Sequence, residues 1–65
     1  MIKVNGKEQD FVADMTIGEL LDRMGYARNR VAVEKNGLIV PRAQFDEAGV
    51  DEEDVIEVLS FVGGG

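Results

Sequence analysis

The sequence of 65 residues contains no cysteine and no histidine, and only one proline. Without the first two residue types the chain has no disulfide, no thiolate nucleophile, no thiolate or imidazole ligand for a metal, and no imidazole base. The absence of cysteine is compatible with a reducing cytoplasm. Few catalytic options remain, and we expect a protein that is not an enzyme and binds no cofactor or metal.

Length sets a second limit. A chain of this size forms one small domain that buries about 60% of the surface exposed by the unfolded chain, so a deep catalytic cleft is not expected. No apolar run approaches the length of a membrane span, and the start, Met1 to Val4, has no charged leader followed by a long apolar segment. We expect a soluble, cytoplasmic protein without a membrane partner.

Charge is strongly unbalanced, with 13 acidic and 7 basic residues and a net charge of −6. The negative electrostatic potential of such a protein repels nucleic acid and anionic lipid, and it speeds encounter with a basic protein surface. Arg28 and Arg30 form the only basic cluster, and we expect them in a solvated connection because no glycine-rich anion cradle accompanies them. The acidic block at 51–54 is predicted to be a solvated turn.

The first half of the chain predicts a hairpin followed by a helix. Residues 2–4 alternate apolar and polar side chains, as in a strand with one buried face. Asn5-Gly6 is a strong signal for a type I′ turn, because both central positions of that turn need a positive φ. A second strand is predicted at 8–13, with Phe11 and Ala13 facing the core.

The helix start is specified by several signals. Thr16 and Glu19 have the spacing of a capping box, and Met15 is placed to pack on Leu20 as a hydrophobic staple. Gly25 is expected to end the helix in the left-handed conformation. The helix is amphipathic, and its predicted apolar stripe consists of Ile17, Leu20, Leu21 and Met24.

The second half predicts another hairpin and an irregular segment. A strand begins at Val31, a turn falls at Asn36-Gly37, and a short strand follows at 38–40. Pro41 ends that strand or places it at an edge, because proline cannot donate to a ladder. A helical turn at 42–48 is expected to carry Phe45 inward.

The closing strand is predicted at 55–62, and both of its faces are largely apolar. A domain this small buries one face under one helix, so the face that carries Glu57 is expected to be partly exposed. Leu59 and Phe61 on that face, with Val62, would then form a docking patch for a partner. A central strand covered by an irregular segment is the alternative.

The sequence ends in three glycines, Gly63, Gly64 and Gly65. Glycine has no side chain and few backbone restrictions, and three residues reach about 10 Å, so this segment could enter a narrow channel of a partner. The terminal carboxylate of Gly65 is the candidate functional group. We predict a domain at 1–62 and a flexible glycine tail at 63–65. The element order indicates an α+β fold of the β-grasp (ubiquitin-like) type, with a mixed sheet of four to five strands on one main helix.

The whole chain resembles the ThiS family, the sulfur-carrier proteins of thiamine biosynthesis. The ordered set of matching segments carries the resemblance, since a terminal Gly-Gly also occurs in molybdopterin-synthase small subunits and in ubiquitin-like modifiers. A third terminal glycine is a variation that leaves the last residue unchanged. The segments are Val4-Asn5-Gly6, Thr16 to Leu21, Val31 to Arg42, Asp54 to Glu57 and Phe61 to Gly65.

The resemblance implies a sulfur carrier that is a substrate of other enzymes. A ubiquitin-activating-type, ThiF-like enzyme would consume ATP to adenylate Gly65, and a cysteine desulfurase or persulfide protein would supply the sulfur of a thiocarboxylate. A ThiG-like thiazole synthase would use that sulfur, with Gly63 and Gly64 inserted into the partner active sites. The alternatives are a molybdopterin-synthase-type subunit, a ubiquitin-like modifier and a non-catalytic interaction domain.

Overall fold

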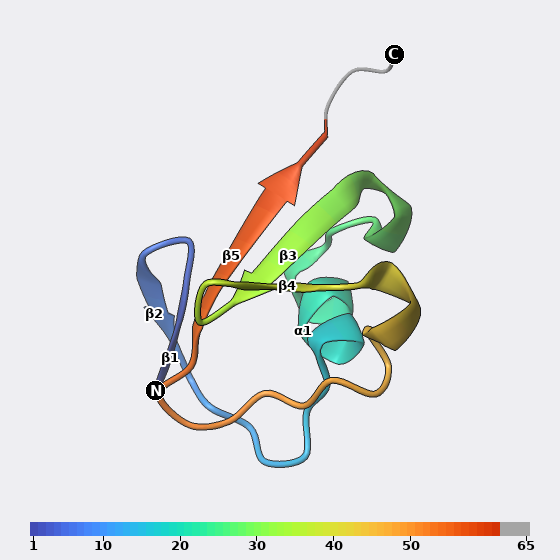
Figure 1. Ribbon diagram of the computed structural model, residues 1–65. Coiled ribbons are helices and arrows are strands. Elements are labelled where there is room, and N and C mark those ends of the chain that lie inside the picture. The colour runs from blue at the N-terminus through green and yellow to red at the C-terminus, as the bar shows by residue number, and fades with distance from the viewer. Residues whose placement is uncertain (62–65) are drawn as a thin grey trace.

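The computed structural model of the chain describes residues 1–61. These residues form five strands, one α-helix and two short 3-10 helices (Figure 1). Val62 and the predicted tail, Gly63 to Gly65, lie outside the described residues. The elements in chain order are β1 (Ile2–Val4), β2 (Lys7–Gln9), α1 (Ile17–Met24), η1 (Arg28–Arg30), β3 (Val31–Lys35), β4 (Leu38–Val40), η2 (Arg42–Gln44) and β5 (Val55–Ser60).

The strands form one mixed sheet in the order β2-β1-β5-β3-β4, so the last strand of the chain is the central strand of the sheet. Strand β5 runs parallel to β1 and antiparallel to β3, and each hairpin is antiparallel. Figure 1 shows β1 and β5 side by side, with the N-terminus at the start of both. This topology is the predicted α+β, β-grasp arrangement.

One apolar core lies between α1 and the sheet. Its members are at most 5% exposed, and Phe45 is among them, as predicted from the turn at 42–48. Met24 was predicted to belong to the apolar stripe of the helix, and that prediction was wrong. Met24 is the last residue of α1, it is 36% exposed, and it lies outside the core cluster. The core consists of Ile2, Val4, Met15, Ile17, Leu20, Leu21, Val31, Val33, Phe45, Val50, Ile56 and Val58.

Both predicted ends of α1 are confirmed. The Thr16 hydroxyl accepts a hydrogen bond from the Glu19 N–H at 3.1 Å, and the Glu19 carboxylate accepts one from the Thr16 N–H at 3.1 Å. Gly25 has a φ of 82°, and the next N–H, that of Tyr26, donates to the Leu21 carbonyl at 2.9 Å. These are the capping box and the Schellman arrangement, which together satisfy backbone groups at both ends of the helix.

Both Asn-Gly turns are confirmed by their backbone angles. Asn5 and Gly6 have φ values of 52° and 81°, and Asn36 and Gly37 have values of 53° and 84°. Positive φ at both central positions is the requirement of a type I′ hairpin turn. The two turns therefore set the registers of β1 with β2 and of β3 with β4.

The asparagines of these turns also bind β5. The Asn5 side chain accepts from the Val58 N–H at 2.7 Å and donates to the Val58 carbonyl at 3.2 Å. On the other edge of β5, the Asn36 side chain accepts from the Val55 N–H at 2.9 Å. Asn5 thus continues the pairing of β1 with β5 after the β1 backbone has turned away, because its amide offers the same donor and acceptor as a peptide group.

Two predicted strands are longer than the observed ones. The strand predicted at 8–13 ends at Gln9, because Gln9 pairs with Ile2 and β1 has no earlier residue to pair with. Phe11 still packs on the core, but Ala13 is exposed, contrary to the prediction. The final strand, predicted at 55–62, ends at Ser60 in the described part of the chain.

Arg28 has a structural role that the sequence analysis missed when it placed this residue in a solvated connection. Its guanidinium donates to Asp22 at 3.0 and 3.2 Å and to Asp46 at 2.7 Å, so it joins α1 to the segment after η2. A Cβ at Gly18 would lie 2.6 Å from the guanidinium, and glycine leaves the space that this position requires. The hydrogen bonds from Arg28 lower the pKa of Asp22 below its usual value.

The acidic block at 51–54 is not fully solvated, because Asp54 is buried. Its carboxylate accepts from the Asp51 N–H at 2.7 Å and from the Asn36 amide at 2.9 Å, and the Lys35 ammonium lies 3.5 Å away. Burial alone raises the pKa of Asp54, but the Asp51 N–H, the Asn36 amide and Lys35 outweigh burial, and the pKa is lowered. Sequence reasoning missed this site because the Asn36 and Lys35 partners come from another hairpin.

Asp54→Asn is expected to lower the free energy of unfolding near pH 7 by about 1 kcal/mol or more, because charge-assisted hydrogen bonds are lost. A carboxylate whose pKa is lowered by folding gives stability that is present above its unfolded pKa of about 3.9 and is lost as the pH falls. Urea unfolding of both proteins should therefore show the difference shrinking below about pH 4. The exposed Asp10→Asn is the control for loss of one charge, and a wild-type advantage that persists unchanged in acid would contradict this account.

Candidate functional site

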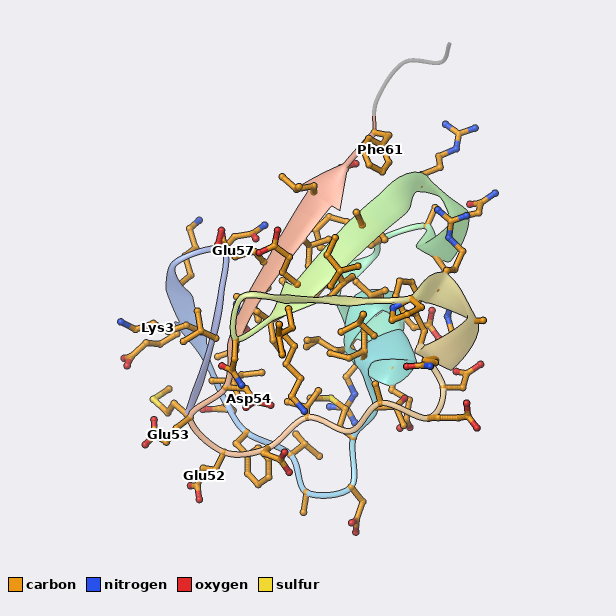
Figure 2. The ribbon with its side chains drawn as sticks, viewed as in Figure 1. Lys3, Glu52, Glu53, Asp54, Glu57 and Phe61 are labelled. Carbon is orange, nitrogen blue, oxygen red and sulfur yellow. The ribbon has the colours of Figure 1, made fainter. Side chains whose placement is uncertain are left out.

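The site residues predicted from the sequence lie at the end of β5 or beyond it. Leu59 belongs to β5 and Phe61 follows it, whereas Val62 and the three glycines are outside the described residues. The Phe61 N–H donates to the Arg30 carbonyl at 2.7 Å, so the chain still follows the edge of β3 at the last described residue. Figure 2 shows Phe61 at the end of β5, where the described chain stops.

Strand β5 buries one face and exposes the other. Ile56 and Val58 are 0% and 5% exposed, whereas Leu59 and Phe61 are 57% and 59% exposed. The sequence left two possibilities, an exposed patch or a covered central strand. Within residues 1–61 the face that carries Glu57 is exposed, and the first possibility is confirmed.

Strands β3 and β4 extend this exposed side of the sheet. In the register of the sheet, Ala32 is opposite Leu59, Glu34 is opposite Glu57, and Ile39 is opposite Glu34. Directly opposed residues of antiparallel strands project to the same side of the sheet. We call this side the open face, and its members are Lys3, Glu8, Ala32, Glu34, Ile39, Val55, Glu57, Leu59 and Phe61.

Sequence analysis did not find the part of the open face that β3 and β4 supply. Ile39 is 71% exposed, and with Leu59 and Phe61 it makes the surface mainly apolar around the two glutamates. A signal for it was present, because a two-residue Asn36-Gly37 turn fixes which residues of the hairpin oppose one another. What the sequence did not specify was the pairing of β3 with β5.

The candidate site in residues 1–61 is an exposed surface and not a pocket. Residues 1–61 contain no group of three or more acidic, cysteine or histidine side chains that could hold a metal ion. No helix of that part is long and apolar enough to cross a membrane. A hollow of about 320 Å³ lies between α1 and the end of β2, lined among others by Met15, Leu20 and Arg23 and by no residue of β5. Within residues 1–61 the exposed apolar surface beside the end of β5 is therefore the open face.

Comparison with known proteins places the chain in a family. The family model described as the ThiS family matches residues 2–65, which include β1 at one end and the three glycines at the other. The chain belongs to the ThiS family. The predicted resemblance is confirmed, and the match includes the residues that lie beyond the described structure.

Relatives of similar length support the assignment to the ThiS family. The sulfur carrier protein ThiS of Bacillus subtilis is 36% identical to this chain over the full length of both proteins. The crystal structure of the thiamine biosynthesis protein ThiS from Geobacter metallireducens superposes with a TM-score of 0.80 at 36% identity, covering 98% of this chain and 97% of that one. The second comparison confirms the β-grasp fold.

Two thiazole synthases contain a region similar to this ThiS-family chain. The enzyme of Paramagnetospirillum magneticum is 40% identical over 95% of the chain, and that of Magnetococcus marinus is 39% identical over 98%. The chain spans about a fifth of the length of these two relatives, 19% and 20% respectively. In these proteins a ThiS-like region is therefore one part of a larger polypeptide.

Phe61→Ala is expected to lower the free energy of unfolding by less than about 1 kcal/mol, because substitutions at exposed positions have small effects. Phe45→Ala, the matched substitution of a buried phenylalanine, should cost about 3–5 kcal/mol through loss of packing and an internal cavity. Urea denaturation of the two variants checks this difference. Equal losses would mean that Phe61 belongs to the core and not to the open face.

Proposed function

We propose that this chain is a sulfur carrier of thiamine biosynthesis that holds sulfur as a thiocarboxylate on Gly65. The observation that carries the proposal is that the exposed end of β5 and the terminal glycines are neighbours in the sequence. The central strand places Leu59 and Phe61 on the open face and leads directly toward the glycines that the ThiS family match includes. The surface for recognition and the proposed site of the chemistry are thus close together in the sequence. In this role the protein is a substrate of other enzymes and supplies no catalytic group.

The terminal carboxylate needs activation before it can accept sulfur. A carboxylate is a poor electrophile because it is anionic and would have to expel oxide or hydroxide. A ubiquitin-activating-type, ThiF-like partner would supply ATP, which this chain does not hold as a cofactor. The Gly65 carboxylate oxygen attacks the α-phosphorus of ATP, pyrophosphate leaves, and an acyl adenylate forms with AMP as its leaving group.

Sulfur then replaces the activated oxygen. The outer sulfur of a cysteine persulfide, on a cysteine desulfurase or another persulfide protein, attacks the acyl carbon, and AMP leaves. A second thiol attacks the donor cysteine sulfur of the resulting acyl disulfide. A new disulfide forms between those two cysteines, and the thiocarboxylate leaves on Gly65. That sulfur is nucleophilic and ionised at neutral pH.

A ThiG-like thiazole synthase is the partner that takes this sulfur. The two thiazole synthases that contain a ThiS-like region support this pairing, because a covalent link between two parts that work together raises their effective concentration. Gly63 and Gly64 have no side chains, so they suit a narrow path to a buried site about 10 Å from the carrier body. We propose that the carrier acts in the cytoplasm together with these enzymes.

Docking to these partners uses the open face. Leu59, Phe61 and Val62 precede the glycines, so a partner that binds them also receives the terminus. The exposed apolar side chains of Leu59 and Phe61 can be buried in a complex at little cost to the folded carrier. Successive partners must bind and release the same strand end, which favours moderate affinity.

Extending the chain by one alanine after Gly65 is expected to abolish sulfur loading, because the reactive carboxylate moves to another residue. The carrier is incubated with the adenylating enzyme, ATP and a cysteine desulfurase with cysteine, and its intact mass is then measured. The unextended protein should exchange one oxygen for one sulfur. Replacement of Gly37 by alanine, in the turn beside the start of β5, tests whether a small folding defect alone prevents loading.

The same mass spectra decide between the functions. An extended chain that still gains sulfur would contradict terminal chemistry. Conjugates of the carrier with lysines of other proteins, without a thiocarboxylate, would indicate a ubiquitin-like modifier. Sulfur loading followed by delivery to molybdopterin precursor and not to thiazole synthase would indicate a molybdopterin-synthase-type subunit, and no reaction at all would leave a non-catalytic interaction domain.

A further inference from the structure

Two carboxylates oppose one another in the middle of the open face. Glu34 of β3 is paired with Glu57 of β5, and directly opposed side chains have Cβ atoms about 4.5–5.5 Å apart. Figure 2 shows Glu57 on β5, the strand that Phe61 follows. Like charges in this position destabilise a sheet. The folded protein alone gains nothing from this pair.

No cation of the described chain neutralises this pair. The ion pairs within residues 1–61 join Arg28 to Asp22 and Asp46, and Lys35 to Asp51 and Asp54. Neither glutamate takes part in an ion pair or in a side-chain hydrogen bond in that part of the protein. Lys3 shares the open face: it is opposite Val55, two residues before Glu57 on that face, and on its other side it is opposite Glu8 of β2.

Apolar side chains lie next to both glutamates on the side of β4 and toward the end of β5. Ile39 lies opposite Glu34 on one side, and Leu59 follows Glu57 two residues along the same face. Both apolar side chains are more than half exposed. A partner that covers them also removes water from the two carboxylates, and a buried charge without a counter-charge is strongly unfavourable. A partner that fits this face must therefore bring a cation to its centre.

We infer that Glu34 and Glu57 together accept one arginine or lysine side chain of the thiazole synthase that takes the sulfur, seated among apolar side chains of that enzyme. The inference rests on the proposed function and adds the chemistry of the partner surface. An arginine fits best, because its planar guanidinium has five donors and can bind two carboxylates at once. The cation fixes how the carrier sits on the enzyme, and so where the strand end points.

The negative charge of the open face and of the whole protein disfavours a second copy of the chain, nucleic acid or an anionic membrane as the binding partner. A second copy of the chain would bring four carboxylates together around one two-fold axis. Nucleic acid and anionic membranes are repelled by a protein of net charge −6. A basic protein surface is the partner that both the local pair and the overall field attract.

The test compares two double variants that change net charge equally. Glu34→Gln with Glu57→Gln neutralises the pair, and Glu47→Gln with Glu52→Gln neutralises two exposed glutamates outside the open face. Each carrier is titrated into the thiazole synthase of the same organism by calorimetry, at low salt and at physiological salt. The first variant is expected to bind at least about tenfold more weakly than the wild type, and the control within about twofold.

A measurement of stability distinguishes an effect of the Glu34 and Glu57 change on binding from an effect on folding. Removing opposed like charges should leave the urea midpoint of the Glu34 and Glu57 variant equal to or above that of the wild type, so its weaker binding cannot come from unfolding. Equal losses of affinity in both double variants, or no loss in the first, would overturn the inference. A wild-type carrier that gains no sulfur and does not bind the enzyme would overturn the proposed function, whereas a wild type that does both, with no effect of the Glu34 and Glu57 change, would overturn this inference alone.

Discussion

The structure depends on the pairing of β5 between β1 and β3. This strand is the last in the chain and the central one in the sheet, so its burial joins both hairpins into one domain. Asn5 and Asn36 reinforce it from opposite edges with hydrogen bonds to the backbone of Val58 and Val55. Each asparagine has two functions, since it also takes the positive φ of its own turn. Removing either side chain would therefore affect a strand that lies far away in the sequence.

The two sides of β5 differ in burial: one side packs in the core, and the other side is exposed. The side that faces α1 holds Ile56 and Val58 in the core and supplies stability, and the open face leaves Leu59, Phe61 and Ile39 for a partner. Because α1 alone cannot cover both sides of the sheet, a fold of this size leaves one side available. In the sulfur carrier proposed above, that available side is what a partner would recognise.

Features set by neighbouring residues could be predicted from the sequence. The Thr16 capping box, the Gly25 helix end and both Asn-Gly turns follow from local backbone requirements. For Leu59 and Phe61 the sequence left an exposed patch and a covered strand open, and the structure shows the exposed patch. The end of β2 at Gln9 was also open to prediction, because the Asn5-Gly6 turn sets which residues pair and β1 begins at Ile2. The burial of Asp54 and the opposition of Glu34 and Glu57 could not be predicted, because both depend on contacts between segments distant in the sequence. The roles of Val62, Gly63, Gly64 and Gly65 stay predictions.

Native-state hydrogen exchange of the Val58 amide tests most directly whether the Asn5 side chain holds the central strand at its β1 edge. In the wild-type protein this amide should exchange only through global unfolding, at the free energy measured by urea denaturation. In Asn5→Gly, which keeps the positive φ but lacks the side-chain acceptor, the same amide should exchange faster through local opening. Rapid exchange of Val58 in the wild type, at the rate of amides in the edge strand β4, would contradict the account.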